Sequence, residues 1–119
     1  MLLSFRKTRG RGLSDQLYRA VGSIGANIAE GYSYTSKKEQ ARYYEYSIGS
    51  AREARHWYHL GRHSLGEEVV SHRMRLTVHI IRQLIKIVPS LRRTIQEDTA
   101  SYEATSLDDL LTKAPLPEE

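Results

Sequence analysis

The stretch that decides the fold is residues 74–95, MRLTVHIIRQLIKIVPSLRRTI. Its apolar residues recur every three or four positions, which is the period of one face of an α-helix. The central row of that face is Met74, Val78, Ile81, Ile85 and Val88. Other apolar residues widen the arc beyond what contact with one neighbouring helix uses. We therefore expect a helix over about residues 67–98, kinked or interrupted at Pro89, which lacks a backbone N–H.

Two more helices are expected before this one. The capping box Ser36-Lys37-Lys38-Glu39 opens a helix of about residues 36–64, and Gly66 breaks the chain after it. A third helix is expected over residues 14–31, with Ser14 as its N-cap. Since no strand pattern occurs, the expected fold class is all-α, an up-and-down antiparallel helical bundle. The expected core contains Ile24, Ile28, Ile48, Ile81 and Ile85.

The 14–31 helix carries glycines at unusual places. Gly22 and Gly25 lie in its interior, where each costs about 1 kcal/mol relative to alanine. We expect the close approach of a neighbouring helix to compensate for that cost. Gly31 is expected to end the helix in the left-handed conformation.

Charge divides the chain into a basic body and an acidic tail. The net charge is +4, but residues 1–96 carry 17 lysines and arginines against 7 acidic residues, and residues 97–119 carry one lysine against 7. Gly10 and Gly12 argue that residues 1–12, with four of these cations, form a basic arm and not a helix. The expected organisation is a bundle domain over residues 1–98 and an acidic tail over residues 99–119. Such a tail can fold back over a basic surface and compete with an anionic partner.

Several classes of function are disfavoured by composition. The chain has no cysteine, so disulfides and thiolate chemistry are excluded. No apolar run approaches the length of a membrane span, and we expect a cytoplasmic protein. No motif pairs a nucleophile with a histidine, so we expect no enzyme and no cofactor. His56, His59 and His63 share a helix face, but the arginines around them argue against a metal site.

One segment resembles a known family. Arg19-Ala20 followed by Ser23 to Tyr32, SIGANIAEGY, is similar to a signature of the four-helix-bundle proteins encoded in intervening sequences of bacterial large-subunit ribosomal RNA. Ser36 to Glu39 and the segment IGSARE, residues 48–53, resemble a second family segment. The resemblance implies a helical bundle that assembles into a ring, with pentamers known in the family. Relatives include accessory variability proteins of diversity-generating retroelements, which bind nucleic acid and a reverse transcriptase.

The chain departs from the family pattern at two places. The family usually has proline where this chain has Gly25, and it has a whole helix before the signature, where this chain has the arginine-rich segment. The fourth element of the bundle is therefore open. The candidates are the 106–113 turn, the segment after Pro89 and a helix of a neighbouring subunit.

The candidate functional residues form three groups. A basic surface expected to bind RNA or DNA phosphates consists of Arg52, Arg55, Arg75, Arg82, Lys86 and Arg93. An interhelical polar network that fixes the helix register is expected from Arg19, Ser23, Asn27, Glu30, Ser50 and Glu53. A homo-oligomer interface is expected around Tyr43, Tyr46 and Trp57. The alternative function is a structural oligomer that recruits a protein partner, with no nucleic acid involved.

Overall fold

The structure is a computed structural model that describes the backbone of residues 2–113 and the side chains of residues 12–104 and 112. It contains three long helices and one short helix: α1 (Leu2–Ser33), α2 (Lys37–Leu60), α3 (Arg62–Leu65) and α4 (Glu67–Lys113). No strand occurs in the backbone over residues 2–113. The all-α fold class is therefore confirmed.

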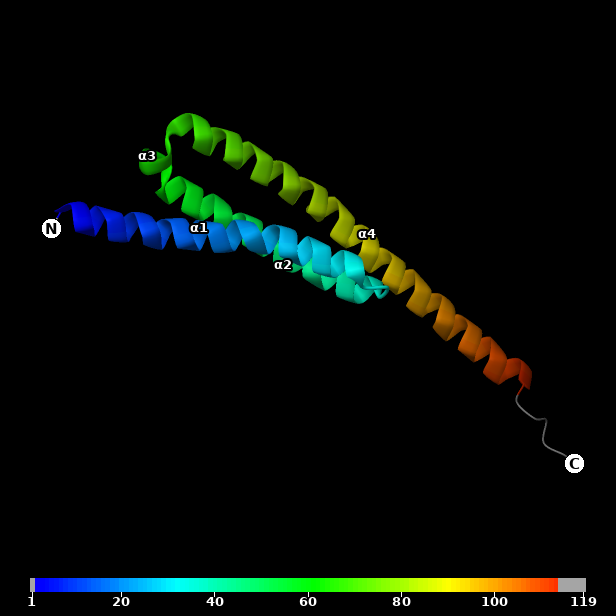
Figure 1. Ribbon diagram of the computed structural model, residues 1–119. Helices are drawn as coiled ribbons and strands as arrows, with labels where there is room; N and C mark the ends of the chain where they lie inside the picture. The colour runs from blue at the N-terminus through cyan, green and yellow to red at the C-terminus, as the bar shows by residue number, and fades with distance from the viewer. Residues whose placement is uncertain (1, 114–119) are drawn as a thin grey trace, which may run out of the picture.

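The long helices run up and down beside one another. α2 is the central helix and packs against α1 on one side and α4 on the other (Figure 1). The short α3 lies at the reversal between α2 and α4. The molecule is elongated, with extents of 95 × 25 × 19 Å, because α4 continues far beyond the other helices.

The first helix is longer than the sequence predicts. α1 begins at Leu2 and not at Ser14, so residues 2–12 are helical and the expectation of an irregular basic arm is wrong. The reason is cooperativity: adding residues to a helix that has already formed is far easier than starting one, so two glycines do not stop it. α1 also continues past Gly31 to Ser33, and Gly31 does not adopt the left-handed conformation.

Helix packing requires glycine at positions other than those expected. A Cβ built on Gly22 or Gly25 would meet nothing within 4 Å, so no neighbouring helix approaches there. A Cβ on Gly31 would lie 2.8 Å from Cε1 of Tyr44, and one on Gly61 would lie 2.7 Å from Cδ2 of Leu13. The close approaches therefore occur at the two ends of the α1–α2 contact.

The boundaries of α2 follow its end signals. The Ser36 hydroxyl accepts a hydrogen bond from the Glu39 backbone N–H at 3.4 Å, as the capping box predicts. The helix stops at Leu60, four residues before the expected end, because Gly61 begins the turn into α3. Gly66 has φ 92° and separates α3 from α4, so the predicted chain break is confirmed.

The last helix is continuous where two breaks were expected. α4 runs from Glu67 to Lys113 and includes Pro89. Proline leaves the carbonyl four residues earlier, that of Ile85, without its helical partner. Both residues are exposed, so water can satisfy that carbonyl. α4 also crosses the expected boundary at residue 98, and residues 106–113 belong to it instead of forming a separate turn.

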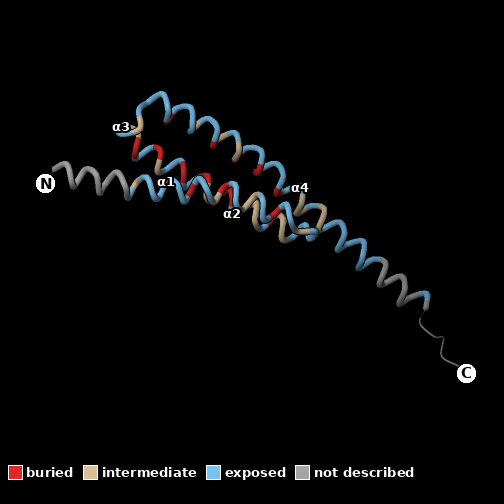
Figure 2. Tube along the Cα trace, in the orientation of Figure 1, coloured by how far each residue is buried: buried red, intermediate tan, exposed pale blue. Residues whose placement is uncertain are grey.

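The core lies along the α2 contacts with α1 and α4 (Figure 2). Ile24, Ile48 and Ile81 are buried and Ile28 is partly buried, as predicted. Ile85 is 44% exposed, so its assignment to the core is wrong. It lines a groove opposite Gly49 of α2, which has no side chain to cover it.

Candidate nucleic-acid interface

The predicted basic residues lie on the outside of the bundle. Arg75, Arg82, Lys86 and Arg93 belong to α4 at spacings of seven, four and seven residues, which places them on one helix face. Arg52 and Arg55 belong to α2. All six side chains are exposed. We call the four α4 residues together with Arg52 the basic face.

Two shallow grooves bring parts of this face together. The first, of about 400 Å³, is lined by Arg75, His79 and Arg82 with Met74 and Val78 beneath them. Its cations all come from α4, so the helical repeat alone creates this half of the site. A polyanion lying in it would contact guanidinium groups at its rim and apolar side chains at its floor.

The second groove joins α4 to α2. It has a volume of about 340 Å³, and Arg52 and Glu45 of α2 stand on it opposite Ile85, Val88 and Pro89 of α4. Ile85 follows Val78 of the first groove by seven residues, so both grooves follow the same flank of α4. The structure therefore brings Arg52 to the same flank of α4. Arg55 lines neither groove.

The cations of the basic face have no acidic partners in the described part of the chain. Only two ion pairs occur among the described side chains, Arg42–Glu39 at 3.6 Å and Arg92–Glu45 at 2.8 Å. Arg92 donates from Nε and Nη2 to one Glu45 carboxylate oxygen, and this links α4 to α2 at the end of the second groove. The face therefore offers uncompensated positive charge to an anionic partner.

The polar residues of α1 do not form the interhelical network that was expected. Asn27 donates to the Ser23 backbone carbonyl at 2.8 Å within α1, and Glu53 accepts from Trp57 Nε1 at 3.1 Å within α2. Hydrogen bonds from side chains of these residues thus stay inside one helix over the described range. Among the described side chains, no hydrogen bond joins Arg19, Glu30 or Ser50 to a neighbouring helix.

The hydrogen bond that does join the two helices comes from a residue that sequence reasoning missed. Ser47 is fully buried, and its hydroxyl donates to the Ile24 carbonyl at 2.8 Å. The signal was present in the sequence, because Ser47 lies one turn from Tyr44 and Ala51 on the apolar seam of α2. A small polar residue in such a seam indicates a buried hydrogen bond.

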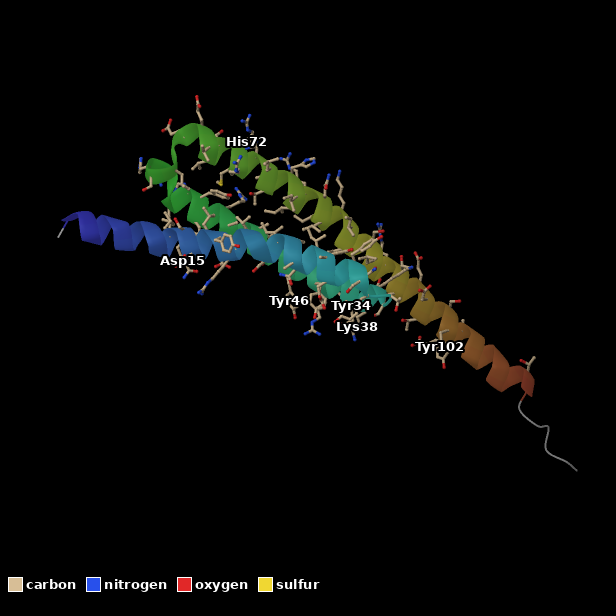
Figure 3. All side chains as sticks on the ribbon, in the orientation of Figure 1. Asp15, Tyr34, Lys38, Tyr46, His72 and Tyr102 are labelled. Carbon is tan, nitrogen blue, oxygen red and sulfur yellow. The ribbon has the colours of Figure 1, made fainter. Side chains whose placement is uncertain are left out.

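The proposed interface aromatics divide into two groups. Tyr34 stacks on Tyr43 with ring centroids 5.3 Å apart, and Tyr43 meets Tyr46 edge-on at 5.6 Å. The labelled Tyr34 and Tyr46 lie near the α1–α2 connection in Figure 3. Arg42 donates to the Tyr46 hydroxyl, and this bond raises the Arg42 pKa. Trp57 lies further along α2 against His56.

Within the tyrosine group the pKa of Tyr34 is altered. A hydrogen bond with Tyr43 raises the pKa of Tyr34 to about 12. The aromatic group is thus held by contacts among its own members. Tyr46 nevertheless remains 46% exposed.

The expectation that His56, His59 and His63 share one helix face is wrong, because α2 ends at Leu60 and His63 lies on the short α3. Arg62 donates to the His59 carbonyl at 2.8 Å and lies 3.4 Å from its ring nitrogen. Among the side chains that the structure describes, no three histidine, aspartate or glutamate residues are arranged to hold a metal ion.

Comparison with known proteins identifies the family of this chain. The fold defines a small helical-bundle protein whose basic face carries cations with no acidic partner among the described side chains. Residues 1–86 match the family described as 23S rRNA-intervening sequence protein, and the chain belongs to that family. The searches of curated proteins and of solved structures gave no match. None of the helices over residues 2–113 has the length and apolar character needed to cross a membrane.

Proposed function

We propose that this protein is a non-catalytic, cytoplasmic homo-oligomer that binds RNA or DNA through the basic face, without strong sequence preference. The observation that carries the proposal is the row of exposed cations along α4 that have no acidic partner among the described residues. When such protein cations bind phosphates, they displace the counterions condensed on the nucleic acid. The release of these counterions is the main source of sequence-independent binding.

The spacing of the cations suits a backbone contact. Arg75 and Arg93 lie 18 residues apart, which is about 27 Å along a helix at 1.5 Å per residue. Phosphates follow one another along a nucleic-acid strand over such a distance, so several of them can be contacted at once. The grooves at Arg75–Arg82 and at Arg52 add apolar floors that a ribose or base can touch.

Assembly would multiply these contacts. The bundle leaves large apolar side chains exposed, and the family resemblance favours a closed ring of five subunits as the assembly we propose. Tyr43, Tyr46 and Trp57 remain our candidates for its interface. Several weak phosphate sites on one ring would act together, so the avidity would exceed the affinity of one subunit.

A salt titration tests the proposal. Fluorescence anisotropy with labelled single-stranded RNA and double-stranded DNA, measured over a series of salt concentrations, should give an affinity that falls linearly on a log–log plot. The expected slope is about −0.7 per contact for single strands and about −0.9 for duplex. Binding that is absent at low salt would overturn the proposal.

One observation supports the second candidate, a scaffold that recruits a protein. Val69, Leu76 and Ile87 of α4 are each between 43% and 48% exposed. Their spacings of seven and eleven residues put them on one flank of the helix, away from the cations. A protein partner that binds this flank would be unaffected by salt, in contrast to a polyanion on the basic face.

A further inference from the structure

α4 continues beyond the bundle without a partner in its own chain. Residues 96–104 are exposed at every position, and Tyr102 is 74% exposed (Figures 2 and 3). The backbone remains helical to Lys113. We call residues 97–113 the α4 extension, and it lies outside the residues that match the family.

The extension lacks both packing against another element and partners for its acidic side chains, and a second molecule could supply both. Residues 96–104 are exposed at every position, so this part of α4 lacks the tertiary packing that supplies most of the stability of a helix in a protein. The charges of the extension are also unfavourable, since it holds five acidic residues and a single lysine, and two of the acids, Asp108 and Asp109, lie near the negative end of the helix macrodipole. Glu97, Asp98 and Glu103 have no ion pair among the described side chains.

The extension cannot reach the basic face of its own chain. It continues the axis of the helix that bears Arg75, Arg82, Lys86 and Arg93, and so it carries the acidic residues away from them (Figure 1). Folding back would require α4 to break, and the structure has one continuous helix from Glu67 to Lys113. Over residues 99–113, the expectation that the tail covers its own basic body is therefore not met, and residues 114–119 lie outside the described residues.

A second copy of the chain offers the acidic α4 extension a basic surface, and offers the basic face an acidic helix. The extension is about 24 Å long and the row from Arg75 to Arg93 about 27 Å, at 1.5 Å per residue. Their charges are opposite, and both belong to α4. An antiparallel pair of α4 helices from copies in two different rings would therefore lay each extension along the basic face of the other copy, a two-fold contact in which the same surfaces are used twice.

We propose that the α4 extension docks in trans on the basic face of a second copy and competes there with nucleic-acid phosphates. The inference rests on the proposed function for the identity of the face. It adds a second ligand for that face, the chain's own acidic helix. Polyanion binding would then release the extension, and self-association would weaken polyanion binding.

Energy transfer between two full-length populations tests the contact without nucleic acid. Since the chain has no cysteine, one engineered cysteine takes one dye. A donor is placed at Ser101→Cys on the extension, and an acceptor at Ser90→Cys beside the basic face, both exposed positions. Mixing the populations at low salt should give transfer, and salt should reduce it.

Charge reversal decides whether the two surfaces meet. Glu97→Lys with Asp98→Lys and Glu103→Lys in the donor copy should lower transfer sharply, because half of the two-fold contact becomes repulsive. Arg75→Glu with Arg82→Glu and Lys86→Glu in the acceptor copy should lower it for the same reason. Combining the two reversed copies should restore it, because the charges are again opposite. As a matched control with the same change in charge, an acceptor copy with Arg19→Glu, Arg55→Glu and Arg73→Glu, three exposed cations outside the basic face, should keep its transfer.

The outcomes separate this inference from the proposed function. Transfer that either reversal leaves unchanged, or that never rises above that of unlinked dyes, overturns the docking in trans. Transfer that follows the charges supports it even if no RNA or DNA binds in the anisotropy titration. In that case the proposed function fails while the contact between copies stands.

Discussion

The Ser47 hydroxyl donates a 2.8 Å hydrogen bond to the backbone carbonyl of Ile24 and thereby joins α2 to α1. Ser47 is fully buried and Ile24 is 7% exposed, so the bond lies inside the core and not at its margin. It is the hydrogen bond between the two helices that fixes their register in the described part of the chain.

Removing that hydroxyl should destabilise the bundle modestly. Ser47→Ala should lower the free energy of unfolding by about 1 kcal/mol, because the net contribution of such a hydrogen bond to stability is about 0.5–1.5 kcal/mol. Urea unfolding followed by circular dichroism measures it. Ser50→Ala on the same helix is the matched control and should change stability by less than about 0.5 kcal/mol. Equal effects at both positions would mean that the Ser47 bond does not fix the register.

Two glycines should respond to alanine in opposite directions. At Gly31 a Cβ would lie 2.8 Å from Tyr44 Cε1 and 3.2 Å from Tyr43 Cβ, so Gly31→Ala should destabilise by about 1–3 kcal/mol. At Gly49 the Cβ meets nothing within 4 Å, so Gly49→Ala should stabilise α2 by about 0.5–1 kcal/mol. Thermal unfolding of the two variants checks this, and the same sign in both would contradict the helix packing described above.

The two isoleucines at the α2–α4 contact should also differ. Ile81 is 7% exposed, and Ile81→Ala should cost about 2–5 kcal/mol through the lost burial and the cavity that remains. Ile85 is 44% exposed, and Ile85→Ala should cost clearly less, about 1 kcal/mol or below. Chemical denaturation of both variants gives the comparison. A larger loss at Ile85 would place that residue in the core after all.

Apolar periodicity was enough to predict the fold class and most of the core. The rows that contain Ile24, Ile48 and Ile81 follow the helical period, and burial follows them. The same period could not tell Ile81 from Ile85. Ile85 is exposed because α2 presents Gly49 opposite it, and which residues face each other across two helices is a property of the tertiary structure.

Helix ends were predicted well where a side chain caps them and poorly elsewhere. Ser36 accepts from the Glu39 N–H, and Gly66 has a positive φ, as their residue types indicate. Gly10, Gly12 and Pro89 do not end their helices, because a long helix tolerates a few unfavourable residues once its neighbouring turns are formed. The basic residues of α4 were found because they share a helix face. The addition of Arg52 to that face needed the packing of α2 on α4.

The tyrosine group makes a prediction about pH. The bond with Tyr43 raises the pKa of Tyr34 to about 12, which favours the neutral phenol in the folded chain. The resulting stabilisation is present below pH 10, the ordinary pKa of tyrosine, and is lost as pH rises toward 12. The difference between tyrosinate absorbance titrations of the unmodified chain and Tyr34→Phe should have its midpoint near 12.

Tyr43→Phe provides the control for this titration. It removes the hydroxyl that raises the pKa of Tyr34, so the Tyr34 midpoint should fall back toward its ordinary value. A midpoint near 10 in the unmodified chain, with no change in Tyr43→Phe, would show that the two hydroxyl groups do not interact.

The central claim, that the basic face binds phosphates, is tested most directly by the salt dependence of two double variants of equal charge. Arg82→Ala with Lys86→Ala removes two cations from the face, and Arg19→Ala with Arg73→Ala removes two exposed cations, one on α1 and one on the other flank of α4. Anisotropy titrations with labelled RNA over a range of salt give the log–log slope for each. The first variant should flatten the slope by about 1.4 to 1.8, corresponding to two lost phosphate contacts, and the second should leave it near that of the unmodified chain. Equal slopes for the two variants would contradict a localised phosphate-binding face.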